Sequence, residues 1–225
     1  MTAPTPTTLR RRRLEAAILD YNGVLGVQPS PTQWRGLAEL AGWPAQEAAA
    51  FQKAFWKRRT AYDEGTITTH VFWDGLLRGG LSARPGSALL AELTHADTQM
   101  WTTIDPAVLE VLHAAHRAGT PLVLLSNAPR PLAAALDATD WCATLFTKTV
   151  YSARIGVNKP HRRAYEAALA VAGWPSPEQT LFVDDRADNV EAAARLGLLS
   201  SHYTGDPGEL ARHLTQPAGQ LARRP

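Results

Sequence analysis

Asp20 is a candidate catalytic or metal-binding residue, because it follows directly on a predicted strand. It ends an apolar run over residues 14–19 and is followed three positions later by Gly23, a pattern that predicts a buried strand with one carboxylate at its carboxyl end. Open α/β sheets bind their ligands at that end, where an aspartate can act as a nucleophile or ligate a hard metal ion. The alternative is an aspartate that only shapes a turn, because this spacing to glycine is common in turns.

Other polar and charged residues stand where later predicted strands end or helices begin. They are Ser126 and Asn127 after the apolar run 121–125, Lys159 before the predicted helix 161–172, and Asp184 and Asp185 at the end of the run 180–185. Because the carboxyl ends of parallel strands meet at one edge of a sheet, we expect these side chains to converge with Asp20.

Such a cluster of carboxylates needs a cation, since two of them 4 Å apart repel by about 4 kcal/mol at an effective dielectric constant of 20. Mg²⁺ suits the site because it takes oxygen ligands and commonly bridges carboxylates to a phosphate. Lys159 would add a second positive charge, and Ser126 would hold phosphoryl oxygens. Structural alternatives are that Lys159 only neutralises the acids, Ser126 caps a helix and Asp185 shapes a turn.

Strands and helices alternate through most of the chain. The predicted strands cover residues 14–20, 121–125, 145–151 and 180–185, and the predicted helices cover residues 107–118, 129–136, 161–172 and 187–196. This alternation predicts an α/β fold with a doubly wound, parallel, Rossmann-like sheet.

Residues 28–98 interrupt this alternation with helical patterns. Their aromatic residues, which include Phe51, Phe55 and Phe72, recur at helical spacing and predict a small core of their own. We therefore expect a disordered basic tail over residues 1–13, a core domain formed by residues 14–27 and 99–225, and a helical domain formed by residues 28–98.

The composition is that of a soluble globular protein, with 45% hydrophobic and 20% charged residues among 225. Cys142 is the one cysteine, which excludes an internal disulfide and favours a reducing cytoplasm, with the thiol as a buried apolar group. No apolar run approaches the roughly 20 residues that cross a bilayer, and the N-terminus lacks a secretory signal. We expect a cytoplasmic protein without a membrane partner.

The basic character is confined to an arginine run over residues 10–13. Without these four arginines the formal net charge changes from +2 to −2, so the body of the chain is nearly neutral. We expect the run to be a solvated arm and expect no nucleic-acid partner, because no basic stripe continues from it.

The four motifs together resemble those of the haloacid dehalogenase superfamily of hydrolases, in the branch that carries a helical cap after the first strand. The motifs are Asp20-Tyr21-Asn22-Gly23-Val24-Leu25, Ser126-Asn127, Lys159-Pro160, and Asp184-Asp185 with Asn189. The resemblance implies that Asp20 is the nucleophile that forms an aspartyl-phosphate, that Ser126 and Asn127 bind the phosphoryl group and that Lys159 orients it. It also implies that Asp20, Asp184, Asp185 and the backbone carbonyl of Asn22 hold Mg²⁺.

Residues 55–68 with Phe72 and Trp73 resemble the cap of the glucose-1-phosphate phosphatase-like and epoxide-hydrolase N-terminal-like members. Such a cap closes over the site, excludes water and selects the substrate. Arg58, Arg59 and Tyr62 could meet the polar end of a substrate, although solvent-facing arginines are the commoner case on such a helix. The implied partner is a small phosphorylated molecule, bound by a monomer or a homodimer.

Asn22 departs from the pattern of the superfamily's phosphatases, which usually carry an aspartate there to protonate the leaving group. An amide cannot transfer that proton, and general acid–base catalysis is worth about 10² to 10⁴ in rate. From the sequence we expect a Mg²⁺-dependent phosphatase whose rate depends steeply on the leaving group. The alternatives are a regulatory protein that binds a phosphorylated ligand or a partner and, more distantly, a 2-haloacid dehalogenase, against which the Asp184-Asp185 pair argues.

Overall fold

A parallel sheet forms the centre of the structure, a computed structural model that describes residues 13–77 and 86–215. The strands are β1 (Ala16–Leu19), β2 (Leu122–Ser126), β3 (Phe146–Tyr151), β4 (Thr180–Asp184) and β5 (Leu199–His202). They form a five-stranded sheet in the order β3-β2-β1-β4-β5, in which every pairing is parallel. The predicted α/β fold class is therefore confirmed, and β1, which delivers Asp20, is the central strand.

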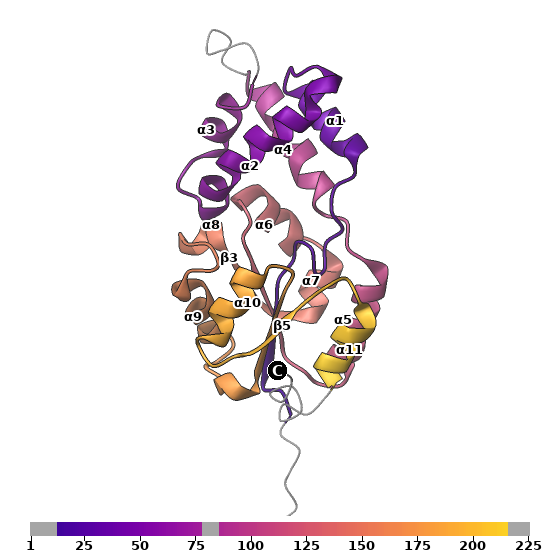
Figure 1. The fold of residues 1–225 in the computed structure, drawn as a ribbon, viewed down its shortest axis with the longest axis vertical. Coiled ribbons are helices and arrows are strands. Elements are labelled where there is room, and N and C mark those ends of the chain that lie inside the picture. Colours follow the sequence, from indigo (N-terminus) through magenta and orange to yellow (C-terminus); the bar gives the residue numbers. More distant parts are fainter. Residues whose placement is uncertain (1–12, 78–85, 216–225) are drawn as a thin grey trace, which may run out of the picture.

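Helices cover both faces of the sheet (Figure 1). The core helices are α5 (Pro106–Arg117), α6 (Arg130–Asp137), α7 (Asp140–Leu145), α8 (Ser152–Ile155), α9 (Arg162–Val171), α10 (Ala187–Ala194) and α11 (Pro207–Thr215). Successive β1 residues point to opposite faces: Ile18 belongs to the apolar cluster that contains Tyr165 of α9, and Leu19 to the cluster that contains Val108 of α5. Burial on both faces explains why the strands read as continuous apolar runs.

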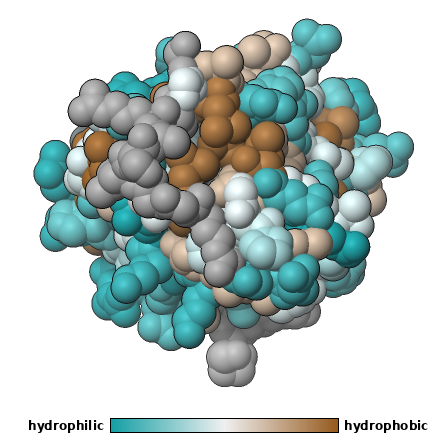
Figure 2. Space-filling model, turned by 90° about the horizontal axis from the view of Figure 1, so that it is seen from above, coloured by the Kyte–Doolittle hydropathy of each residue, from teal (hydrophilic) through white to brown (hydrophobic). Residues whose placement is uncertain are grey.

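The insert between β1 and α5 contains only helices among the residues described there. These are α1 (Pro31–Leu40), the short 3₁₀ helix Ala45–Glu47, α2 (Ala48–Glu64), α3 (Thr69–Asp74) and α4 (Ser87–Met100). They lie together at one end of the molecule (Figure 1), whose outer face presents hydrophilic side chains around an apolar patch (Figure 2). Phe51, Phe55, Phe72 and Trp73 are fully buried. The insert thus builds the aromatic core that its spacing predicts, and its boundaries as a domain remain a prediction.

The two connections between insert and core run side by side. Val27 N donates to Thr103 O and Asp105 N donates to Leu25 O, both at 2.8 Å. Asp105 also caps α5, since its carboxylate accepts from Ala107 N at 2.8 Å. This pairing holds the start and the end of the insert next to the end of β1, where Asp20 lies.

Most predicted elements occur within one or two residues of their expected bounds, as is normal for helix and strand ends. Strand β5 was not predicted, because its Ser200 and Ser201 break the apolar pattern. Arg13 contacts the backbone of Ala118 through its guanidinium, whereas residues 1–12, which are the rest of the predicted disordered tail, lie outside the described residues. In the described part of the chain, no helix has the length and apolarity needed to cross a membrane.

Candidate active site

Asp20 and Lys159 meet at the carboxyl edge of the sheet. Lys159 Nζ donates to Asp20 Oδ1 and to Asp184 Oδ2, each at 2.7 Å, and to the carbonyl of Leu125 at 2.9 Å. All three side chains are buried, with Lys159 4% and Asp184 0% exposed. One ammonium therefore bridges two carboxylates that come from neighbouring strands.

Three carboxylates form a group that could hold a metal ion. One oxygen each of Asp20, Asp184 and Asp185 can be chosen so that all lie within 4.8 Å of one another. Asp185 reaches this position beside Gly23, where a Cβ atom would lie 2.1 Å from Asp185 Oδ2. Gly23 also has a φ of 88°, which favours glycine. The turn glycine after Asp20 is thus required both by its backbone and by the carboxylate against it.

Burial controls the protonation of these groups. It raises the pKa of Asp20 to about 7, against the lowering effect of Lys159 and with a further rise from the charge of Asp184. Burial, followed by the charge of Asp184, also raises the pKa of Asp185. Burial alone would lower the pKa of Lys159, but the carboxylates of Asp20 and Asp184 raise it, so the ammonium stays charged. The acids outnumber this cation, and an added divalent cation would favour their ionised forms.

Two asparagines position the charged groups. Asn127 Nδ2 donates to Lys159 O at 3.0 Å and Asn127 Oδ1 accepts from Lys159 N at 2.8 Å, so this amide holds the Lys159 backbone. Asn189 Nδ2 donates to both carboxylate oxygens of Asp184, at 3.0 and 3.1 Å. The Asn127 side chain, expected to bind a phosphoryl group, is therefore engaged with Lys159, although it still lines the cavity described below.

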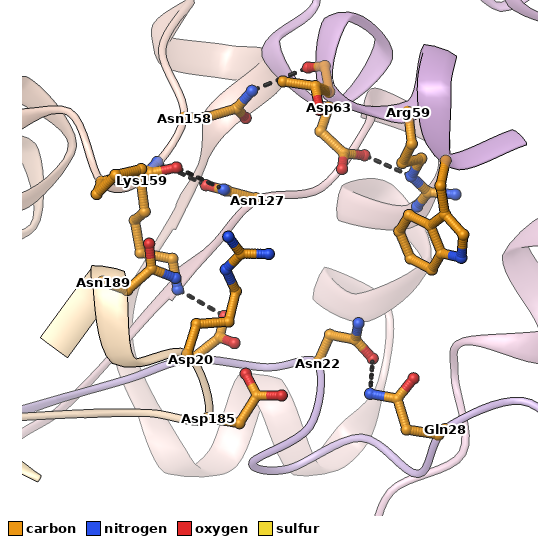
Figure 3. Close-up of a pocket in the computed structure, with 14 residues that line it drawn as sticks. Asp20, Asn22, Gln28, Arg59, Asp63, Asn127, Asn158, Lys159, Asp185 and Asn189 are labelled. Atoms are coloured by element: carbon orange, nitrogen blue, oxygen red, sulfur yellow. Dashed lines mark hydrogen bonds and ion pairs between the residues drawn. The ribbon is translucent and has the colours of Figure 1, made fainter. Parts of the chain in front are cut away.

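Ser126 and Asn22 lie beside the carboxylates. The Ser126 hydroxyl is buried, and within the described part of the chain its oxygen has no hydrogen-bond partner. Buried polar atoms are rarely left unpaired, so this hydroxyl suits a ligand that brings its own hydrogen-bonding oxygen. Asn22 Oδ1 accepts from Gln28 Nε2 at 3.2 Å, and the Asn22 amide faces the same space as Asp20 (Figure 3).

A cavity of about 460 Å³ separates these core residues from the insert. The core lines it with Asp20, Asn22, Asn127, Asn158, Lys159, Pro160, Asp185, Arg186 and Asn189, and the rest of its lining is Gln28, Trp56, Arg59, Thr60 and Asp63. Figure 3 shows Arg59 and Asp63 on helix α2, across the cavity from Asp20 and Asp185. Its volume is in the range of small-molecule sites.

Arg58 and Tyr62, which were expected to meet the polar end of a substrate, lie outside the cavity. Arg58 donates to Val71 O at 3.0 Å and its guanidinium packs against Gly75. The Tyr62 hydroxyl pairs with Thr69 at 3.1 Å, and its ring stacks on Phe72 with a centroid distance of 4.2 Å. Neither lines the cavity. Neighbouring residues of an α-helix point about 100° apart, so Arg58 and Tyr62 face away from the cavity that Arg59 and Asp63 line.

Arg59 of α2 lines the cavity and is held by two acids. Arg59 Nε donates to Asp63 Oδ1 at 2.6 Å, and Arg59 Nη1 contacts the Asp97 carboxylate of α4 at 3.1 Å. The guanidinium carbon lies 5.2 to 5.9 Å from the ring centroids of Phe55, Tyr62 and Trp101. Asp63 was missed by sequence reasoning, although its spacing of four residues from Arg59 on a predicted helix is the signal that could have found it.

The amino-acid sequence is similar to those of known hydrolases. A family model described as a haloacid dehalogenase-like hydrolase matches residues 14–197. The chain is 28% identical over 154 residues to a sesquiterpene phosphatase of Aspergillus oryzae, covering 63% of this chain and 77% of that protein. It is 31% identical over 103 residues to a phosphoglycolate phosphatase of Salmonella typhimurium, covering 46% of this chain and 40% of that protein.

Solved structures share the fold. One is a haloacid dehalogenase family enzyme of Bacteroides thetaiotaomicron in complex with magnesium and inorganic phosphate, with a TM-score of 0.63 and 21% identity. The alignment covers 90% of this chain and 100% of that one.

Proposed function

The chain belongs to the haloacid dehalogenase-like hydrolases, and we propose that it is a Mg²⁺-dependent phosphatase that acts on a small phosphorylated metabolite through a phosphoryl-enzyme at Asp20. The observation that carries this proposal is the meeting of Asp20, Lys159, Asp184 and Asp185 at one wall of the cavity. The two relatives described as phosphatases support the same class of reaction.

The donor set suits Mg²⁺. Asp20, Asp184, Asp185 and the backbone carbonyl of Asn22 are the oxygen groups that would hold it, as expected for a hard cation. The Ser126 hydroxyl has no partner among the described residues, so it would be able to hydrogen-bond a phosphoryl oxygen of the substrate. When bound, the ion would neutralise the carboxylates, favour the ionised form of Asp20 and offset charge on the phosphoryl oxygens.

The reaction of this proposal has two steps. A carboxylate oxygen of Asp20 attacks phosphorus while the bond from phosphorus to the leaving oxygen breaks, and the bonding electron pair stays on that oxygen. Lys159 and Ser126 stabilise the phosphoryl oxygens during the transfer. Water then attacks the phosphorus of the aspartyl-phosphate while the bond from phosphorus to the Asp20 oxygen breaks, which releases inorganic phosphate and restores the Asp20 carboxylate.

The helical insert serves as the cap in this proposal. Two bonds place α2 over the core site, since Asn158 Nδ2 donates to Thr60 O at 2.9 Å and the Ser152 hydroxyl donates to Asp63 O. The insert supplies the far wall of the cavity, so it would exclude water and select the substrate.

The test is a phosphate-release assay across small phosphoesters, with Mg²⁺ and with a chelator. We expect turnover that requires Mg²⁺ and that falls by about 10⁴-fold or more in Asp20→Asn, because the amide is nearly isosteric but a far poorer nucleophile. Asp140→Asn, at an exposed aspartate of α7, is the matched control and should keep full activity. Turnover that persists in Asp20→Asn contradicts the covalent mechanism.

Asn22 favours a second candidate, a regulatory protein whose site binds a phosphorylated ligand without turning it over. That candidate expects Mg²⁺-dependent phosphate binding with no phosphate release from any ester. The dehalogenase alternative expects halide release without metal, and the three clustered acids count against it.

A further inference from the structure

In the proposed reaction the described acids on the core side of the cavity already have other roles, since Asp20 is the nucleophile and Asp185 would hold Mg²⁺. The leaving oxygen must take up a proton, and Asn22 cannot supply one. Asp63 of α2 is a carboxylic acid that lines both the main cavity and an adjoining cavity of about 30 Å³. The smaller cavity is also lined by Asn22, Ser126 and Asn127. Asp63 therefore shares a cavity with Asn22 and Ser126, where the phosphoryl group and its leaving oxygen would lie in the proposed reaction.

The Asp63 carboxylate is presented to the cavity in a defined way. Its Oδ1 accepts from Arg59 Nε at 2.6 Å, and Figure 3 shows the carboxylate pointing into the cavity from the insert side. The side chain is only 12% exposed. The Asp63 backbone is fixed as well, because its carbonyl accepts from the Ser152 hydroxyl of the core. The acid is thus held against the core site rather than carried on a loose loop.

The surroundings of Asp63 allow it to hold a proton. Asp63 and Asp97 share the guanidinium of Arg59, so two buried carboxylates face one cation. Burial raises the pKa of Asp63 to about 7, opposed by Arg59 and aided by Asp97, and burial raises the pKa of Asp97 as well. Asp97 also accepts from Trp101 Nε1 at 3.0 Å and lines neither cavity. Only Asp63 of this pair can pass a proton to a substrate.

We propose that Asp63 is the general acid of this protein, replacing from the insert the group that is missing at Asn22. The inference rests on the proposed phosphatase function. As the bond from phosphorus to the leaving oxygen breaks, that oxygen takes the Asp63 proton, and Arg59 stabilises the carboxylate that remains. In the second step the Asp63 carboxylate accepts a proton from the attacking water, which restores the acid.

The test uses two substrates that differ in their need for a proton. An aryl phosphate such as p-nitrophenyl phosphate has a leaving group that departs unaided, whereas glycerol phosphate needs protonation. With Mg²⁺ present, we expect Asp63→Asn to lower kcat/KM for glycerol phosphate by about 10²- to 10⁴-fold and for the aryl phosphate by less than about 10-fold. A variant that lowers both values equally, or neither, overturns the proposal.

Asp97→Asn is the matched control. Like Asp63→Asn, it leaves Arg59 with one carboxylate, but it changes no group that lines a cavity. We expect it to keep the ratio of the two kcat/KM values close to that of the unmutated protein. A shift of this ratio equal to that in Asp63→Asn assigns the effect to the packing of Arg59 and overturns the proposal.

The unmutated protein gives a second readout that does not depend on how a variant folds. The ratio of kcat/KM for glycerol phosphate to that for the aryl phosphate should fall as pH rises through about 7, because Asp63 loses its proton. The described charged and titratable groups around it are Arg59, Tyr62 and Asp97, and across the cavity Asp20, Lys159, Asp185 and Arg186. Those across the cavity act on both substrates and cancel in the ratio. A ratio that stays constant from about pH 5 to about pH 9 overturns the proposal.

Failure of the phosphatase function would look different. Absence of Mg²⁺-dependent phosphate release from the aryl substrate, or its persistence in Asp20→Asn, overturns that function and this assignment with it. Release that Asp20→Asn abolishes, combined with a substrate ratio that Asp63→Asn does not change, overturns only the role of Asp63.

Discussion

Lys159 Nζ lies 2.7 Å from Asp20 Oδ1, although 139 positions separate the two residues in the chain. The same nitrogen lies 2.7 Å from Asp184 Oδ2, so one buried ammonium compensates two buried carboxylates. Breaking such a pair by removing one partner leaves uncompensated charge in the interior and typically costs about 3–5 kcal/mol.

The first prediction concerns Lys159→Met, which removes the ammonium and keeps much of the volume. In a chelator we expect a lower melting temperature than that of the unmutated protein, because Asp20 and Asp184 lose their cation. Added Mg²⁺ should then raise the melting temperature of the variant by more than it raises that of the unmutated protein. Lys148→Met, at an exposed lysine of β3, is the control. Equal Mg²⁺ shifts in all three proteins would speak against a metal site beside Lys159.

The second prediction compares two glycine substitutions. Gly23→Ala would place a methyl group 2.1 Å from Asp185 Oδ2 at a φ of 88°, so Asp185 must move and Mg²⁺ binding should weaken by about 10-fold or more. In Gly36→Ala the methyl group meets nothing within 4 Å on helix α1. That control should raise the free energy of unfolding by up to about 1 kcal/mol. Calorimetric Mg²⁺ titration and thermal melts measure both, and equal Mg²⁺ affinity in the two variants would contradict the site.

The third prediction is a pH dependence of stability. The pKa of Asp63 is raised by burial from 3.8 to about 7, so the folded protein binds more protons than the unfolded chain between these values. The contribution of Asp63 to the free energy of unfolding is therefore greatest below about pH 4, and it is lost as pH rises through about 7. Asp63→Asn should remove on the order of 2–4 kcal/mol of this change. Urea unfolding of both proteins from about pH 4 to about pH 8 measures it, and parallel pH curves would contradict it.

The fourth prediction separates the two positions that could carry the acid. With Asp63 present, Asn22→Asp should raise kcat/KM for an alkyl phosphate by less than about 10-fold, because Asp63 already donates the proton. In the Asp63→Asn background the same change should restore about 10- to 10³-fold. Gln28→Glu, which adds a carboxylate beside Asn22, controls for added charge. A large gain from Asn22→Asp alone would contradict Asp63 as the proton donor. It would instead support the steep leaving-group dependence that the sequence predicts.

The order of motifs was readable from the sequence because each lies within a local pattern. An apolar run that ends in Asp20, or in Asp184 and Asp185, predicts a strand and a carboxylate at its end without knowledge of the rest of the chain. A parallel sheet then brings such ends to one edge, which accounts for the closeness of Asp20 and Asp184, the two carboxylates that Lys159 bridges. Strand β5 escaped prediction because its middle residues are serines in a half-exposed edge strand.

The sequence alone could not show which residues of the insert reach the cavity. Arg58, Arg59 and Tyr62 are near neighbours on one helix, and which of them reaches the cavity depends on how α2 is rotated against α3 and α4. Packing of the aromatic core sets that rotation, so Arg59 turns to the cavity and Arg58 to Val71. The sequence alone thus determined that Asp20, Asp184 and Asp185 stand where strands end, because strand ends are specified locally. Only the tertiary structure decided that Asp63 faces Asn22 across the cavity, because that contact depends on the packing of two separate segments.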